Sequence, residues 1–195
     1  MAKRADRRVE RSKAALQQAL LTLIQERGFE ALSVQDITDR ANVGRATFNA
    51  HFQNKEDLLA SGIDGLRAGL REVQRRALTD PSSRSERTLS FSHELFAHAN
   101  AHREVFQAMV GKRSGAVVQQ LLHKMAVDLV RDELAALSAR GGDRTIPTEA
   151  VAQFIGSGLF GLLMWWGQGR MRMPVEEVDA LFRRLAVPAM KAPLG

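Results

Sequence analysis

The chain has 195 residues, of which 45% are hydrophobic and 26% charged, an ordinary soluble composition with room for one large domain or a small one joined to a larger one. It contains no cysteine, which excludes disulfides, thiol nucleophiles and cysteine-bound zinc and fits a reducing cytoplasm. The net charge of +6 favours a polyanionic partner.

The basic charge gathers at the start of the chain, where residues 1–13 hold six Lys or Arg against two acids. A basic arm over residues 1–8 that leads into a helix could reach DNA phosphates, although a solvated tail has the same composition. We expect no signal peptide, because no apolar stretch with a cleavage site follows. We also expect no membrane span, since the longest apolar run, Val151 to Trp166, includes Gln153 and several glycines. A cytoplasmic protein is expected.

Apolar residues recur at intervals of three and four almost everywhere, which predicts an all-α fold. Gly28 is placed to end the first helix, and the capping box Ser33-Val34-Gln35-Asp36 predicts the start of the second. The predicted helices span residues 9–27, 34–41, 45–51, 54–78, 84–99, 101–109, 115–139, 147–169 and 174–187.

Two short helices joined by a glycine-containing turn, over residues 33–52, have the spacing of a helix-turn-helix motif. Phe48 and Phe52 lie four residues apart and predict the buried face of the second of these helices. The opposite face is then free to enter the major groove of DNA, and small Gly44 and Ala46 let the start of the helix approach a phosphate. A purely structural helical hairpin has similar spacing.

Residues 33–52 and the segment Asn54-Lys55-Glu56-Asp57-Leu58-Leu59 that follows resemble the DNA-binding signature of the TetR family (TetR/AcrR type) of transcriptional regulators. The preceding helix, which ends in Arg27-Gly28-Phe29, is similar to the first helix of that family. The resemblance implies a three-helix DNA-binding domain over residues 9–69 and a helical ligand-binding and dimerisation domain over residues 70–195.

The resemblance also implies which residues meet DNA. Ser33 and Lys55 are expected to hold phosphates, and the other positions touch backbone or bases. The candidate DNA-binding residues are Ser33, Gln35, Gly44, Arg45, Ala46, Thr47, Asn49, His51 and Lys55. The family usually has a tyrosine where this chain has Asn49, so this position has either lost a phosphate contact or gained the bidentate pairing with adenine that asparagine can make.

In the second domain, helically spaced apolar residues predict either a packed core or, as the resemblance implies, the walls of a small-molecule pocket. The candidate pocket residues are Phe91, His93, Phe96, Phe106, Met109, Leu122, Met125 and Trp165. The resemblance places the dimer interface on the last two helices. The candidate interface residues there are Phe154, Leu162, Trp166, Val178, Leu181 and Phe182.

His98 and His102 lie four residues apart but lack a further ligand at suitable spacing, so we predict no metal site, no cofactor and no enzyme. The predicted function is a homodimeric DNA-binding regulator, a repressor that a small hydrophobic effector releases from a palindromic operator. Two alternatives remain open at this stage. One is a helical ligand-binding protein or enzyme with a structural hairpin, and the other is an effector-independent DNA-binding factor.

Overall fold

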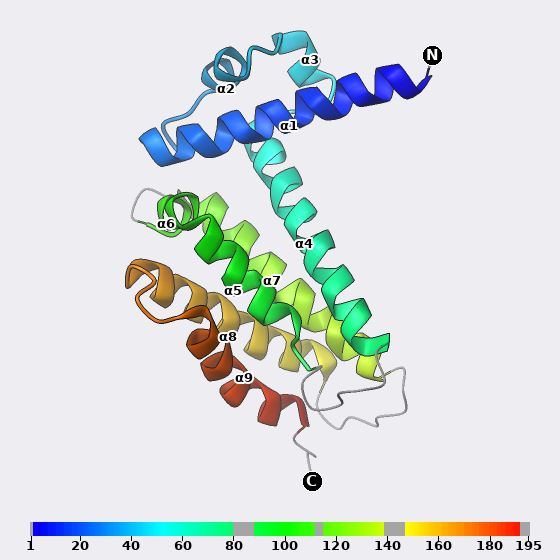
Figure 1. Cartoon of the computed structure of the whole chain (residues 1–195), viewed down its shortest axis with the longest axis vertical. Helices are drawn as coiled ribbons and strands as arrows, with labels where there is room; N and C mark the ends of the chain where they lie inside the picture. Colours follow the sequence, from blue (N-terminus) through cyan, green and yellow to red (C-terminus); the bar gives the residue numbers. More distant parts are fainter. Residues whose placement is uncertain (1, 80–87, 112–114, 139–146, 192–195) are drawn as a thin grey trace.

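The computed structural model describes residues 2–79, 88–111, 115–138 and 147–191. These described residues form nine helices and contain no strand, which confirms the all-α prediction. The helices are α1 (Ala2–Arg27), α2 (Val34–Ala41), α3 (Arg45–Asn49), α4 (Lys55–Thr79), α5 (Phe91–Ala101), α6 (Arg103–Val110), α7 (Gly115–Ser138), α8 (Thr148–Gln168) and α9 (Val175–Lys191). Figure 1 shows α1, α2 and α3 at one end of the molecule, the bundle of α5 to α9 at the other, and α4 running between them.

The first helix is longer than predicted. It begins at Ala2, so the segment expected as a separate basic arm over residues 1–8 is helical from its second residue. Alanine, lysine and arginine are strong helix formers, and neither glycine nor proline interrupts them here. Arg7, Arg8 and Arg11 are therefore exposed on a helix and are not part of a free arm.

Most other helices lie within a few residues of their predicted bounds. The helix predicted over residues 84–99 begins at Phe91, because residues 88–90 form a turn in which Leu89 has a φ of 61°, and residues 84–87 lie outside the described residues. The last helix continues four residues past its predicted end, through Pro188, which removes one backbone hydrogen bond from the final turn without ending it. Gly28 has a φ of 79°, the left-handed conformation expected where a glycine ends a helix.

The first three helices share one apolar core. Leu16, Leu20 and Ile24 on α1 are fully buried together with Ile37 of α2 and Phe48 of α3. At the surface, the Arg40 guanidinium donates two hydrogen bonds of 2.8 Å to the Glu26 carboxylate, which ties α2 to α1. The three helices therefore form one packed unit that presents α3.

Polar contacts hold α4 against α7. Arg67 donates to Asp128, and Arg71 donates to Asp132 at 2.5 Å, one turn further along both helices. Deeper in the interface, the side-chain amide of Gln74 donates to the carbonyl oxygen of Leu129 at 2.9 Å. Because these contacts are directional, they fix the position of α4 along α7 more closely than apolar packing alone would do.

The pair formed by α7 and α8 packs closely because Gly156 has no side chain. A Cβ atom at this position would lie 2.5 Å from the Cα and 2.9 Å from the backbone nitrogen of Val127 on α7. Backbone atoms cannot rotate away, so any side chain at residue 156 forces the two helices apart.

We expect Gly156→Ala to lower the free energy of unfolding by about 2–3 kcal/mol, in the range of overpacked cores. Chemical denaturation followed by circular dichroism measures the change. Gly69→Ala on α4 is the matched control, since that position has open space around it, and it should raise stability by up to about 1 kcal/mol through helix propensity. Equal effects at the two positions would contradict the close approach of α7 and α8.

Among the described helices, α8 is long and apolar enough to cross a membrane by length and composition. In the structure it instead packs on α7 and α9, and residues such as Ala152, Ile155, Leu159 and Leu163 are buried between them. A core helix of a folded bundle satisfies the same test.

Candidate nucleic-acid interface and effector cavity

The start of α2 is built by the predicted capping box. The Ser33 hydroxyl accepts a hydrogen bond from the Asp36 backbone N–H and donates one to the Asp36 carboxylate, which also accepts from the Ser33 backbone N–H at 2.9 Å. These bonds from Ser33, joined by one from Arg27, lower the pKa of Asp36 to about 2. Ser33 is exposed, but in the DNA-free protein its hydroxyl proton serves the cap.

The turn between α2 and α3 has the geometry that the sequence indicates. Asn42 adopts the left-handed conformation with a φ of 51°, and its backbone N–H returns to the carbonyls of Thr38 and Asp39. Gly44 precedes α3 in an extended conformation and is exposed. The chain therefore reverses sharply between the two helices, as a helix-turn-helix arrangement requires.

The rotational phase of α3 agrees with the prediction. Phe48 and Phe52 are buried with ring centroids 5.7 Å apart, whereas Arg45, Ala46 and Asn49 are exposed. Thr47 and His51 are half-buried, and His51 lies in the turn after the helix because α3 ends at Asn49. On α2, Gln35 is exposed and donates to Asp39 at 2.7 Å. The exposed face of α3 thus carries a guanidinium and an amide.

Lys55 has a structural role in addition to the phosphate contact that the resemblance implies. Its ammonium donates to the carbonyl oxygens of Phe29 at 3.0 Å, Glu30 at 3.2 Å and Leu32 at 2.8 Å, and it lies 4.7 Å from the centroid of the Phe29 ring. An ammonium has three protons, so these three carbonyls use all of them. Lys55 therefore clamps the loop between α1 and α2 in the DNA-free structure, an arrangement that competes with the phosphate contact that the resemblance implies.

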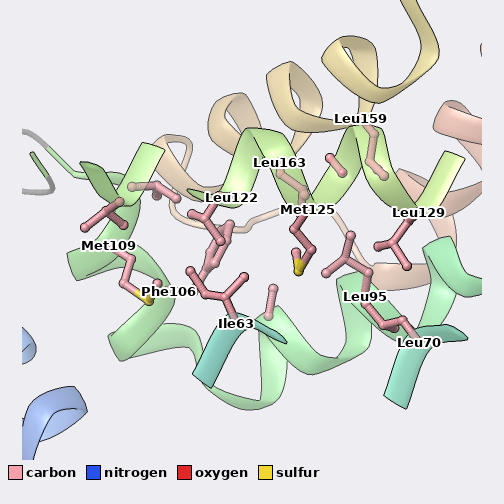
Figure 2. Close-up of a cluster of buried hydrophobic side chains, with 14 of the residues drawn as sticks. Ile63, Leu70, Leu95, Phe106, Met109, Leu122, Met125, Leu129, Leu159 and Leu163 are labelled. Carbon is pink, nitrogen blue, oxygen red and sulfur yellow. The ribbon is translucent and has the colours of Figure 1, made fainter. Parts of the chain in front are cut away.

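A cavity of about 290 Å³ lies between the DNA-binding unit and the bundle, with walls from α1, α4, α5, α6, α7 and α8. Four of the predicted pocket residues line it, namely Phe106, Met109, Leu122 and Met125. Figure 2 shows Ile63, Phe106, Leu122 and Met125 meeting between the helices around this space.

The other four predicted pocket residues lie elsewhere. Phe91 and Phe96 are fully buried, and Phe96 packs edge-on against Trp166 with centroids 5.5 Å apart. His93 does not line the cavity, and Trp165 is 54% exposed on α8. The lining residues that sequence reasoning left out include those of α1 and α4, whose apolar stripes read equally well as a closed core. Examples are Leu20, Leu21, Leu59 and Leu66.

The predicted interface residues divide into two groups. Trp166, Val178 and Phe182 are at most 3% exposed inside their own protomer, and the Trp166 indole donates to the Met173 carbonyl at 2.9 Å, so their assignment to a dimer contact is wrong. Phe154 is 70% exposed, and Leu162 and Leu181 are half-buried. Two large apolar side chains missed by the sequence prediction, Trp165 and Leu185, are exposed beside them.

No group of three or more His, Asp or Glu side chains that could hold a metal ion occurs in the described part of the chain. His98 and His102 do come together, with ring centroids 4.6 Å apart, and both line the cavity. Two imidazoles therefore lie next to each other at a largely apolar wall.

Two family models match the chain in succession. Residues 12–61, which include α2 and α3, match the bacterial regulatory proteins of the tetR family, and residues 86–187 match a transcriptional regulator C-terminal region. The chain belongs to the TetR family. The structure-based placement of the helix-turn-helix unit coincides with the first of these matches.

Individual relatives of this TetR-family chain include the uncharacterized HTH-type transcriptional regulator YxbF of Bacillus subtilis, 44% identical over 62 residues. That match covers 31% of this chain and only 16% of the relative. A putative TetR-family regulator from Syntrophomonas wolfei has a TM-score of 0.73 at 19% identity, over 95% of this chain and 97% of that one. Thermus thermophilus FadR, a TetR-family repressor in complex with lauroyl-CoA, has a TM-score of 0.67 at 21% identity, over 94% and 100% of the two chains.

Proposed function

We propose that this TetR-family protein is a cytoplasmic transcriptional repressor that binds a palindromic operator as a homodimer and leaves it when a small apolar molecule binds. The observation that carries the proposal is the phase of α3, which buries Phe48 and Phe52 and presents Arg45 and Asn49 to solvent. A cavity next to this unit supports control by a ligand. The complex of Thermus thermophilus FadR, a repressor, with lauroyl-CoA supports the same direction of control.

The chemistry of the exposed α3 face suits base reading. A guanidinium such as that of Arg45 can donate two hydrogen bonds to guanine, and the amide of Asn49 can pair with the two groups that adenine presents in the major groove. Neither side chain needs to leave a buried contact to do so. The function proposed is therefore sequence-specific binding and not catalysis.

The test of this function is selection of an operator from a randomised duplex pool, followed by footprinting. We expect Asn49→Ala to lose discrimination at one base pair of each half-site by about 1–3 kcal/mol, and Arg45→Ala to weaken binding. Arg103→Ala is the matched control, because Arg103 is exposed on α6, away from α3. If no sequence is enriched, the hairpin is only structural and the proposal is wrong.

The dimer proposal rests on an exposed stripe along α8. Phe154, Gly158, Gly161 and Trp165 are all exposed, and a Cβ atom on either glycine would meet nothing within 4 Å. Counted along the sequence of α8, the midpoint between Phe154 and Trp165 is also the midpoint between Gly158 and Gly161. A two-fold axis through that point therefore places Phe154 against Trp165 of the partner subunit and Gly158 against Gly161 of the partner subunit.

This pairing has a physical advantage over other registers. Side chains at a contact normally keep the axes of two helices about 8–10 Å apart. Gly158 and Gly161 have no side chain, so the two copies of α8 can approach more closely. Each large aromatic side chain then packs at the edge of the contact. Leu181 and Leu185 on α9 lie four residues apart and can extend the contact to the second pair of helices in a four-helix interface.

A further inference from the structure

The cavity is apolar over nearly all of its wall. Among the described residues that line it, none is Lys, Arg, Asp or Glu, and the polar side chains are Gln17, His98 and His102. An engineered apolar cavity of roughly 150 Å³ binds benzene, so the 290 Å³ here suits a body of about ten carbon atoms. A phosphate or a coenzyme A diphosphate inside the cavity would have no lysine or arginine among the described lining residues to pair with.

The polar side chains lie at the opening of the cavity. Among the described lining residues, those that remain exposed are Gly62, His98 and His102, so the wall of the cavity meets solvent at these positions. Gln17 on α1 lies close by, because its side-chain nitrogen would be 4.0 Å from a Cβ atom on Gly62 and is 3.5 Å from the Ser61 hydroxyl. A ligand with its apolar body inside would thus present its head group to two imidazoles and an amide.

The histidine pair favours an uncharged head group. Partial burial of the ring, together with the charge that His102 would carry, lowers the pKa of His98 below its ordinary value. A neutral imidazole donates at one ring nitrogen and accepts at the other, which matches a hydroxyl group. A carboxylate at this place would have no permanent positive charge beside it.

We propose that the effector is a neutral amphipathic molecule, with an apolar body of about ten carbons in the cavity and a single hydroxyl head group bound by His98, His102 and Gln17. The proposal rests on the proposed function, and it names the class of ligand and the contact through which the ligand acts on the DNA-binding unit. The apolar body of the ligand contacts the DNA-binding unit directly, because the lining residues Gln17, Leu20 and Leu21 belong to α1.

The contact with α1 gives the ligand a direct route to the reading head. α1 packs extensively on α2, and α6 of the bundle packs against α1 near the cavity. A body wedged between α1 and α6 favours a conformation in which the two are further apart, and a ligand shifts an equilibrium by its difference in affinity for the two states. The DNA-binding unit then turns relative to the bundle.

The experiment measures binding of naphthol and decanol to the full-length protein by thermal shift and calorimetry, with naphthoate, decanoate and naphthalene as probes of the head group. We expect a neutral-headed probe to bind at micromolar concentration, at least about tenfold more tightly than its acid or naphthalene, and to displace the selected operator. The His98→Leu/His102→Leu variant should lose about tenfold in affinity for naphthol and keep its affinity for naphthalene. His93→Leu, on the same helix but outside the cavity, is the control.

The α1 contact is tested separately. Leu21→Ala should weaken naphthol binding by about fivefold, whereas Gln18→Ala, exposed on the same helix and outside the cavity, should not change it. Tighter binding of an acid, or no binding of either neutral probe up to about 1 mM, overturns the proposal even if the operator is bound. Failure to bind any operator would instead refute the proposed function, because ligand binding is measured without DNA.

Discussion

Replacing Gly158 and Gly161 together with leucine is expected to convert the protein into a monomer and to weaken operator binding by at least about 100-fold. Both glycines are exposed and a Cβ atom on either would meet nothing within 4 Å, so leucine side chains there have room at the surface of the protomer. They will prevent the close approach of two copies of α8, and a monomer binds one half-site without the gain in effective concentration from the second. Light scattering measures the mass, and fluorescence anisotropy measures binding.

Gly69→Leu is the matched control for this pair, since Gly69 is also an exposed helical glycine with nothing within 4 Å of a Cβ atom. It should remain dimeric. A Gly158→Leu/Gly161→Leu protein that stays a dimer with unchanged DNA affinity would show that the subunits meet elsewhere.

The register of the dimer can be tested by cross-linking, because the chain has no cysteine of its own. Gly158→Cys and Gly161→Cys proteins, made separately and mixed, should form a disulfide between subunits on oxidation. Each alone should do so poorly, since facing residues must bring their Cα atoms within about 7 Å. Equal cross-linking in the mixed and unmixed samples would contradict the proposed two-fold axis.

Lys55→Met is expected to lower the free energy of unfolding by about 2–4 kcal/mol, because it leaves the carbonyls of Phe29, Glu30 and Leu32 without their shared donor. Operator affinity should fall with it, since these carbonyls shape the loop that precedes α2. The slope of the logarithm of affinity against the logarithm of salt concentration should stay unchanged. A structural clamp contributes stability and not a phosphate contact.

Arg45→Ala gives the opposite pattern and serves as the comparison. Arg45 is exposed on α3, so its removal should leave the melting temperature almost unchanged and weaken DNA binding. Lys55→Arg should also destabilise, because a planar guanidinium cannot point protons at three carbonyls that converge on one ammonium. If Lys55→Met keeps its stability but lowers the salt slope by about one, the lysine holds a phosphate after all.

The helix-turn-helix unit could be predicted because its signals are local. The capping box at Ser33 starts α2, Asn42 and Gly44 turn the chain, and the spacing of Phe48 and Phe52 sets the phase of α3. Each depends on residues within a few positions of one another. A short helix with one apolar face has one way to pack, so its exposed face follows.

The bundle could not be predicted at the same level, because its helices are apolar on several faces. On α8, adjacent Trp165 and Trp166 read alike, yet one is exposed and the other is buried against Phe96. In the same way, helical spacing marks both Phe96 and Phe106 as apolar, but only Phe106 reaches the cavity. Which face is covered depends on where distant helices lie.

The all-α class, the bounds of most helices and the exposed face of α3 could be predicted from local patterns, because helix propensity, capping and periodicity act over one or two turns. The contacts of Lys55 with three carbonyls of the preceding loop, and the place of α1 in the wall of the cavity, follow only from how the helices pack. The exposure of Phe154 and Trp165 on α8 follows from the same packing. Each of these outcomes depends on which residues far apart in the chain meet when whole helices pack.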